Sequence, residues 1–269
     1  MATGAETGAV TAERLRGELE VVGRIAASSN LSLLARVDDE GLHVIYKPIR
    51  GERPLWDFPE GTLAGREVAA HLVSELGGWH LVPTTILRDG PLGPGAVQQW
   101  IGDPFHPLAP DSVVDVVPVD HVPAGWLAVL DGETPDGTAV TVAHAARSDV
   151  RSLSVLDAVL NNSDRKGSHC LRDESGRLWA IDHGVSFHAT PKLRTVLWGW
   201  AGEPLTTADR QRVEAVAAGL RRSEVRSALE TLLPAADVFA LESRVHRLLG
   251  SGHHPMPSHE WPSVPWPAL

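Results

Sequence analysis

One stretch of the chain, Val150 to Phe187, restricts the fold more than any other part of the sequence. It begins with apolar residues at spacings of three and four, which is the pattern of one buried helix face; these are Val150, Leu153, Leu156 and Leu160. A polar loop follows and ends at His169. The sequence therefore predicts a helix that runs into a polar loop.

The second half of this stretch predicts a short hairpin. Cys170-Leu171-Arg172 and Arg177-Leu178-Trp179-Ala180-Ile181 are two runs of strand character, separated by the turn signal Asp173-Glu174-Ser175-Gly176. Asp164 lies before the hairpin and Asp182 directly after it. The two carboxylates are therefore expected to face one cleft.

Two acids in this order suit phosphoryl transfer. In kinase-like sites one acid orients the acceptor hydroxyl and takes its proton, while a ligand a few residues on and a second acid hold the metal ion against the nucleotide phosphates. Asp164 would be the first acid, His169 the intermediate ligand and Asp182 the second acid. The alternative is two surface acids that flank a hairpin and have no shared role.

The stretch resembles the phosphatidylinositol 3- and 4-kinases, whose loop reads Asp-Arg-His-x-x-Asn and whose metal motif reads Asp-Phe-Gly. Asp164-Arg165 matches the first pair, the interval to Asp182 matches, and IDHGVSF is similar to the Ile-Asp-Phe-Gly segment. The pattern from Leu31 to Phe187 looks most like an actinobacterial branch of that superfamily. The resemblance implies an α+β, bilobal protein-kinase-like fold with a small β-rich N-lobe and a mainly helical C-lobe.

Three positions depart from the family pattern. Lys166 stands where the family has His, His169 where it has the metal-binding Asn, and His183 where it has Phe. Mg²⁺ prefers oxygen ligands, whereas imidazole suits softer ions. The substitution at His169 therefore implies Mg²⁺ or Mn²⁺ as the metal and leaves open a weak or inactive enzyme.

Upstream residues add to this interpretation. Leu42 to Tyr46 reads as a strand, and Lys47 follows at its end, where kinase-like folds place a phosphate-holding lysine. Thr62 to Leu76 reads as an amphipathic helix that carries Glu67. We predict a Lys47–Glu67 ion pair, with Glu75 as the competing acid. A solvated strand-end lysine and a surface glutamate are the alternatives.

Two further segments are candidate nucleotide contacts. Ser28, Ser29 and Asn30 lie between apolar runs, where a phosphate-covering turn would be formed by backbone amides. Gln99, Trp100 and Ile101 end a predicted strand, where the hinge between the lobes would bind adenine. An ordinary hairpin turn and a buried strand end explain the two segments equally well.

We divide the chain into three parts. Residues 1–103 form the N-lobe, with an antiparallel sheet and one helix, and residues 104–250 form the C-lobe, with the loop, the metal motif and the helices. Three terminal helices are expected at Thr207–Leu220, Ser223–Leu233 and Pro234–Leu249. Residues 251–269, with five prolines, should be an extended, solvated tail.

The composition restricts which binding partners and which cellular location are expected. The formal net charge of −10 argues against nucleic acid, since phosphate contacts need basic surfaces. No apolar run approaches the length of a membrane span, and the N-terminus lacks a signal-peptide pattern, so a cytoplasmic protein without stable membrane insertion is expected. The single cysteine, Cys170, excludes an internal disulfide.

These observations predict an ATP-dependent phosphotransferase acting on a small-molecule or protein hydroxyl. Lys47 would hold the phosphates, Asp182 and His169 the metal, and Asp164 the acceptor, while Arg165 and Lys166 would neutralise charge on the transferred group. A nucleotide-binding pseudokinase is the first alternative. A metal-dependent hydrolase using Asp164, His169, Asp182 and His183 is the second.

Overall fold

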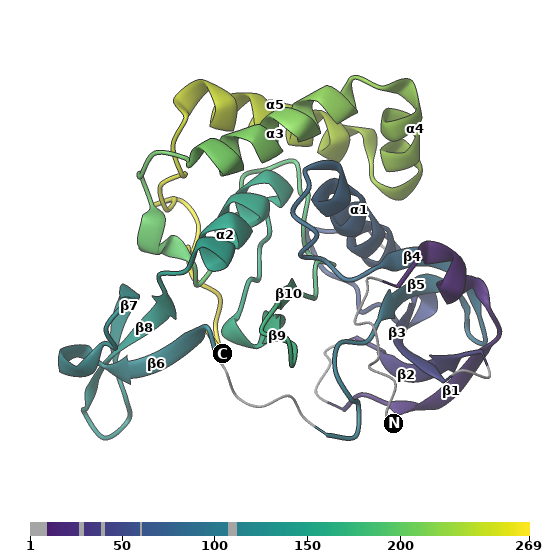
Figure 1. Cartoon of the computed structure of the whole chain (residues 1–269), viewed down its shortest axis with the longest axis horizontal. Coiled ribbons are helices and arrows are strands. Elements are labelled where there is room, and N and C mark those ends of the chain that lie inside the picture. The colour runs from purple at the N-terminus through teal and green to yellow at the C-terminus, as the bar shows by residue number, and fades with distance from the viewer. Residues whose placement is uncertain (1–9, 27–29, 39–40, 60, 107–111) are drawn as a thin grey trace.

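The computed structural model describes residues 10–26, 30–38, 41–59, 61–106 and 112–269. The candidate phosphate-turn residues Ser28 and Ser29 lie outside the described residues. The chain forms a strand-rich N-terminal region beside a mainly helical C-terminal region (Figure 1). This confirms the predicted α+β class and the arrangement of a strand-rich N-lobe beside a mainly helical C-lobe.

The N-lobe is built on a five-stranded antiparallel sheet with the order β1-β2-β3-β5-β4. Its strands are β1 (Leu19–Arg24), β2 (Leu33–Val37), β3 (Leu42–Pro48), β4 (Thr85–Gly90) and β5 (Gly93–Gln99). Alternate residues of the central strands, such as Val44 and Tyr46, are fully buried in the lobe's own core. Because side chains alternate along a strand, every second residue faces the core, and this fixes the register between neighbouring strands.

One helix, α1 (Leu63–Leu76), belongs to the N-lobe by sequence but packs on both lobes. Its small residues Ala69, Ala70 and Val73 are fully buried and join the core of the C-lobe. Glu52 holds the helix N-terminus, because its carboxylate accepts hydrogen bonds from the amides of Leu63 (3.2 Å) and Ala64 (2.9 Å). An acid at this position satisfies orphan amides and complements the helix dipole.

A three-stranded antiparallel sheet follows the N-lobe, in a region to which the sequence pattern assigned no structure. It has the order β6-β8-β7, with β6 (Val114–Pro118), β7 (Trp126–Glu133) and β8 (Ala139–Ala145). In Figure 1 it projects at the lower left, on the side of the molecule away from β1–β5. The part of the chain that follows the N-lobe therefore contains a sheet as well as helices.

Helix α2 (Ser148–Leu160) and the hairpin of β9 (Cys170–Arg172) and β10 (Leu178–Ala180) form the centre of the molecule (Figure 1). The four apolar residues that predicted the helix are all fully buried. Asn161 ends α2 in the left-handed conformation, and its amide donates to the carbonyl of Asp157. The chain therefore turns sharply into the polar loop.

The chain continues through three helices, α3 (Thr207–Leu220), α4 (Ser223–Leu232) and α5 (Ala235–Ser251), close to the predicted ranges. The tail after α5 is extended, and the prediction that it is solvated holds only in part, since His253 and His259 are exposed whereas other residues pack on the C-lobe. The Gly167 amide donates to the Ala268 carbonyl at 2.8 Å, and His254 is buried. Apolar and backbone contacts along the C-lobe outweigh the expected fraying of a proline-rich end.

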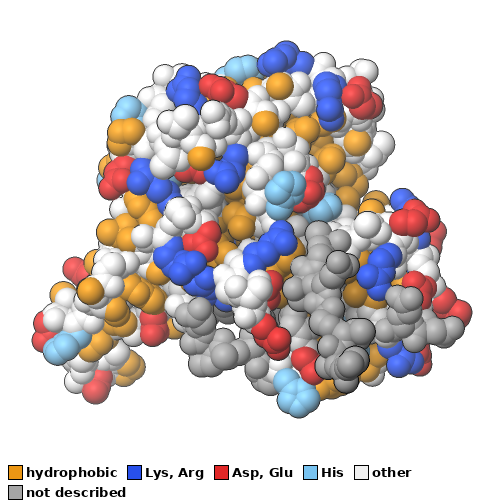
Figure 2. All heavy atoms as spheres, in the orientation of Figure 1, with side chains coloured by type: hydrophobic (Ala, Val, Ile, Leu, Met, Phe, Trp, Pro, Cys, Tyr) orange, Lys and Arg blue, Asp and Glu red, His pale blue; other side chains and the backbone are white. Residues whose placement is uncertain are grey.

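On the face shown in Figure 2, acidic and basic side chains are interspersed. None of the helices in the described part of the chain combines the length and the apolar character needed to cross a lipid bilayer.

Candidate active site at the junction of the lobes

Three charged side chains from distant parts of the sequence meet between the lobes. The ammonium of Lys47, at the end of β3, lies 2.5 Å from Oε1 of Glu67 on α1 and 3.0 Å from Oδ1 of Asp182, which follows β10. The predicted Lys47–Glu67 ion pair is therefore present, whereas Glu75 pairs with His80 at 2.8 Å instead. The site joins the sheet, the helix and the hairpin.

The charges of this trio support one another. Burial works against the Lys47 ammonium, but the carboxylates of Asp182 and Glu67 outweigh it and hold the pKa of Lys47 well above its usual value. The same ammonium holds the pKa of Asp182 well below its usual range. At neutral pH the site therefore presents a cation and an ionised carboxylate, and the Asp182 side chain is 52% exposed.

The backbone at Asp182 is constrained. Its φ of 61° lies in the left-handed region, which a residue other than glycine adopts only where its surroundings impose it. The next amide, that of His183, donates to Oε2 of Glu67 at 3.0 Å. Glu67 thus holds both Lys47 and the turn that carries Asp182, so α1 sets the geometry of the whole trio.

The loop after α2 presents Asp164 to the same space. The Asn162 side chain accepts a hydrogen bond from the Asp164 amide at 3.0 Å, and the Asp164 carboxylate lies 3.2 Å from Nζ of Lys166. Burial raises the pKa of Asp164, and the Lys166 ammonium opposes this rise. Asp164 lines the same cavity as Lys47 and Asp182.

The prediction that Arg165 neutralises charge in the site was wrong. Its side chain is fully buried and lies against the equally buried Asp157 of α2, with Nε 3.0 Å from Oδ2. Its remaining nitrogens contact the Ile181 carbonyl at 3.0 Å and Nε2 of His183 at 2.7 Å. Arg165 therefore ties the loop to α2 and to the Ile181–His183 turn, and no part of it faces the cleft.

His169 lies beside Asp182, with Nε2 3.5 Å from Oδ2. Burial lowers the pKa of His169 to about 4, so the ring is neutral at pH 7. Its buried Nδ1 has no hydrogen-bond partner among the described residues. A neutral imidazole beside an ionised carboxylate is a donor pair that suits Mn²⁺ better than Mg²⁺.

The pair is only part of a coordination shell. In the described ranges no group of three or more His, Cys, Asp and Glu side chains is arranged to hold a metal ion. A cation at Asp182 and His169 would complete its shell with phosphate oxygens and water, as Mg²⁺ and Mn²⁺ sites in nucleotide enzymes do.

The cavity between the lobes is small. It has a volume of about 80 Å³ and includes Asn30, Lys47, Glu67, Asp164 and Asp182 among its lining residues. Ligand pockets typically measure ~300–1,000 Å³. The described residues therefore enclose room for a metal ion and a phosphate group, while a nucleoside would extend beyond them. Asn30 is the part of the predicted phosphate turn that the structure places here.

The predicted adenine contacts are not at this cavity. Ile101 is buried, and the amides of Gln99 and Trp100 already donate to the carbonyls of Thr84 (2.9 Å) and His43 (3.0 Å). These two amides are satisfied within the sheet, so a base cannot accept from them without breaking existing bonds.

Two residues that hold the site together were not predicted. Asp157 anchors Arg165, and the signal for it was an acid between the apolar residues Leu156 and Ala158 of α2. Glu52 caps α1 and lines the cavity from the loop after β3, and no local spacing marks it.

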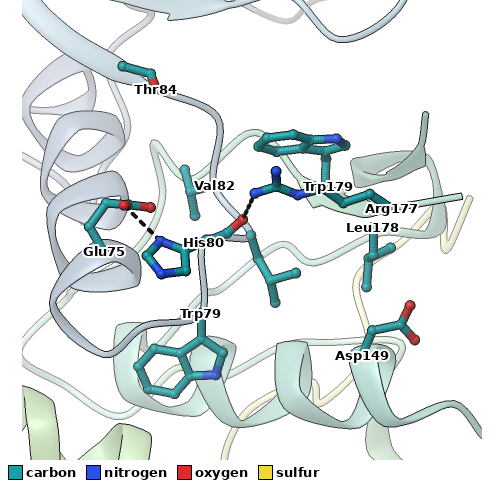
Figure 3. A pocket seen from close by; sticks show the side chains of 10 residues that line it. Glu75, Trp79, His80, Val82, Thr84, Asp149, Arg177, Leu178 and Trp179 are labelled. Atoms are coloured by element: carbon teal, nitrogen blue, oxygen red, sulfur yellow. Dashed lines mark hydrogen bonds and ion pairs between the residues drawn. The ribbon is translucent and has the colours of Figure 1, made fainter. Parts of the chain in front are cut away.

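A larger cavity, of about 550 Å³, lies away from these acids. Figure 3 shows Glu75 and His80 facing one another on one side of it, while the Arg177 guanidinium stacks on the ring of Trp179, 3.8 Å from its centroid. Apart from Glu75, the alternative partner considered for Lys47, none of the predicted site residues lines it. The chemistry predicted from the sequence therefore belongs to the smaller cavity.

Comparison with known proteins gives one close relative. The chain is 43% identical over 260 residues to protein Rv2133c of Mycobacterium tuberculosis, a match that covers 94% of this chain and 93% of the relative. No protein-family model matches the chain. Among solved structures, the Helicobacter pylori proinflammatory kinase CtkA is similar at a TM-score of 0.47 and 8% identity, covering 88% of this chain and 93% of that one. Similarity at this level does not decide fold or activity, so both depend on the geometry described above.

Proposed function

We propose that this chain, which belongs to the same family as protein Rv2133c, is an ATP-dependent phosphotransferase of the phosphatidylinositol 3-/4-kinase-like superfamily. One observation carries the proposal. A lysine on the N-lobe sheet lies between a helix glutamate and an aspartate from beyond the hairpin, at 2.5 and 3.0 Å. Kinase-like sites need this arrangement to hold nucleotide phosphates against a metal ion.

Each side chain has a role that fits its environment. Lys47, kept charged by its two carboxylate neighbours, binds phosphate oxygens. Asp182 and His169 hold a divalent cation, Mg²⁺ or Mn²⁺, which supplies positive charge where negative charge develops on the transferred group. Asn30 lines the cavity in which the phosphates would bind.

Asp164 and Lys166 act on the acceptor side. The raised pKa of Asp164 makes it a better proton acceptor than an ordinary aspartate, which suits the abstraction of a hydroxyl proton. Lys166, 3.2 Å from that carboxylate, is the cation nearest to it and would stabilise charge on the transferred phosphoryl group. The acceptor is a hydroxyl of a small molecule or of a protein.

A nucleotide-binding pseudokinase is the second candidate, and His169 is the observation that favours it. An imidazole in place of an oxygen ligand weakens Mg²⁺ binding. Such a protein would bind ATP and transfer no phosphate.

The hydrolase alternative fits the structure less well. His183, one of its four proposed ligands, is fully buried and lies 2.7 Å from Arg165. The pKa of His183 lies well below its usual value because of burial and the Arg165 charge, so Nε2 accepts a hydrogen bond from that arginine and is not free for a metal.

The test is ATP turnover with Mg²⁺ and with Mn²⁺, combined with thermal shift on the full chain. We expect metal-dependent ATP consumption that falls at least ~100-fold in Asp182→Asn and in Lys47→Met. Asp120→Asn changes an exposed acid that does not line the cavity. It serves as the matched control and should retain full turnover.

The outcomes separate the candidates. Stabilisation by ATP and metal without turnover favours the pseudokinase. Turnover that survives both substitutions, in folded variants, rules out the phosphotransferase site. Turnover that needs metal and Asp182 but not Lys47 favours the hydrolase.

A further inference from the structure

The C-lobe contains a buried arginine that makes no ion pair with any residue that the structure describes. Arg244 of α5 is 6% exposed. Its Nε donates to the Val159 carbonyl at 3.0 Å and its Nη1 to the His188 carbonyl at 3.3 Å. Its Nη2 is buried and has no hydrogen-bond partner among the described residues. A buried charge is normally paired, because desolvation without a counter-charge is costly.

The charges around Arg244 do not compensate it. The nearest acid that acts on it is Asp237, whose carboxylate already binds Arg66 at 2.6 Å. A second arginine, Arg247, lies one turn further along α5, and it makes no ion pair with any described residue. Burial, reinforced by the Arg247 charge, lowers the pKa of Arg244 to about 9. This region is locally positive in a protein whose net charge is −10.

Both arginines line a pocket of about 370 Å³. Most of its remaining surface is apolar, with Leu193, Trp198, Leu248 and Met256 among the side chains, and no aspartate or glutamate is among its lining residues. The volume lies in the range of small-molecule pockets. Arg247 is exposed, so its N–H groups are accessible to solvent, while the buried Arg244 adds positive charge to the same pocket.

We propose that this pocket binds a small molecule with an apolar body and one carboxylate or phosphate group. The apolar wall would bury the body, and the anion would bind the fork of Arg247 and offset the uncompensated charge of Arg244. A guanidinium matches both anions by paired hydrogen bonds. A neutral molecule would leave that charge unbalanced, and a cation would be repelled. The pocket shares no lining residue with the Lys47–Asp182 cavity, so this site does not depend on the proposed function.

The test uses three probes with the same eight-carbon chain: octanoate, octyl phosphate and octanol. Binding to the full chain is measured by calorimetry, with no nucleotide present, so the result is independent of kinase activity. We expect one or both anions to bind at least ~10-fold more tightly than octanol. The anion that binds identifies the head group.

Two variants locate the site. Arg247→Gln should weaken anion binding ~10-fold or more and leave octanol binding unchanged. Arg244→Gln should weaken anion binding further. Arg221→Gln, an exposed arginine at the end of α3, is the matched control and should bind as the wild type does. Should Arg244→Gln fail to fold, the exposed Arg247 variant decides alone. Equal binding of octanol and both anions, or wild-type anion affinity in Arg247→Gln, overturns the proposal.

Discussion

At the scale of single residues, two neighbouring cations show how environment decides role. Arg165 and Lys166 are adjacent in the loop, and the sequence suggested charge neutralisation for both. The structure directs Arg165 inward to Asp157 and leaves Lys166 beside Asp164. A planar guanidinium can satisfy a carboxylate, two carbonyls and a ring nitrogen together, which suits it to a buried anchor.

Replacing Arg165 with Met should therefore destabilise the protein, because Asp157 would be left buried without its counter-charge. We expect a loss of about 3–5 kcal/mol in the free energy of unfolding, measured by urea denaturation. Lys166→Met is the matched control and should change stability by less than ~1 kcal/mol, since its ion pair is partly exposed. Equal stability of the two variants would contradict the anchoring role of Arg165.

At the scale of elements, the segment between β3 and α1 connects the lobes. Asp57 lies 2.5 Å from Nζ of Lys192, and its carbonyl lies 2.9 Å from Nε2 of His188. The Lys192 ammonium also lies over the rings of Trp56 and Trp261, 4.7 and 4.9 Å from their centroids. This segment of the N-lobe is thereby fastened to the chain around His188 and Lys192 and to the C-terminal tail.

Substituting Asp57 with Asn should loosen this fastening, because Lys192 would lose its counter-charge in a largely buried position. Amide hydrogen exchange should accelerate about 10-fold in residues 49–59 and 188–196 together, which corresponds to about 1.4 kcal/mol of local opening. Glu20→Gln, which breaks the exposed pair with Arg36 in the N-lobe sheet, is the control and should leave both segments protected. Acceleration in one segment alone would show that the two do not open as a unit.

At the scale of the whole molecule, buried histidines make the fold sensitive to acid. Burial lowers the pKa of both His144 and His254 to about 4. His144 accepts a hydrogen bond from the Gly199 amide at 3.0 Å through Nε2, which requires the neutral ring. The unfolded chain binds these protons near pH 6.5. The stability that both residues contribute is complete above pH 6.5 and is lost progressively as the pH falls from 6.5 to 4.

Thermal and urea denaturation at pH 7 and pH 5 should therefore show lower stability at pH 5. Removing one such group in His144→Asn should reduce the dependence of unfolding free energy on pH by about 1 kcal/mol per pH unit near pH 5. His121→Asn, at a solvent-exposed position, should leave the dependence unchanged. An equal slope in the wild type and His144→Asn would refute the assignment.

The features that could be predicted were those set by local sequence patterns. The apolar period of α2, the turn between β9 and β10 and the limits of α3 follow from local rules, since each depends on neighbours within a few positions. The spacing of Asp164 and Asp182 about that hairpin likewise indicated a shared cleft. The proposed partnership of Lys47 with Glu67 needed the resemblance to a kinase family as well as the pattern.

What local rules could not supply was decided by contacts between distant segments. Four features depend on residues that no periodicity relates. They are the burial of Arg165, the packing of the tail beside Gly167, the link from Asp57 to Lys192 and, among the described residues, the lack of a partner for Nη2 of Arg244. The sequence by itself determined the helices, the hairpin and the candidate acids, because side-chain period and turn chemistry act over a few residues. Only the tertiary structure decided which charges face the cleft and which are buried, because burial and electrostatic pairing depend on groups brought together by the whole fold.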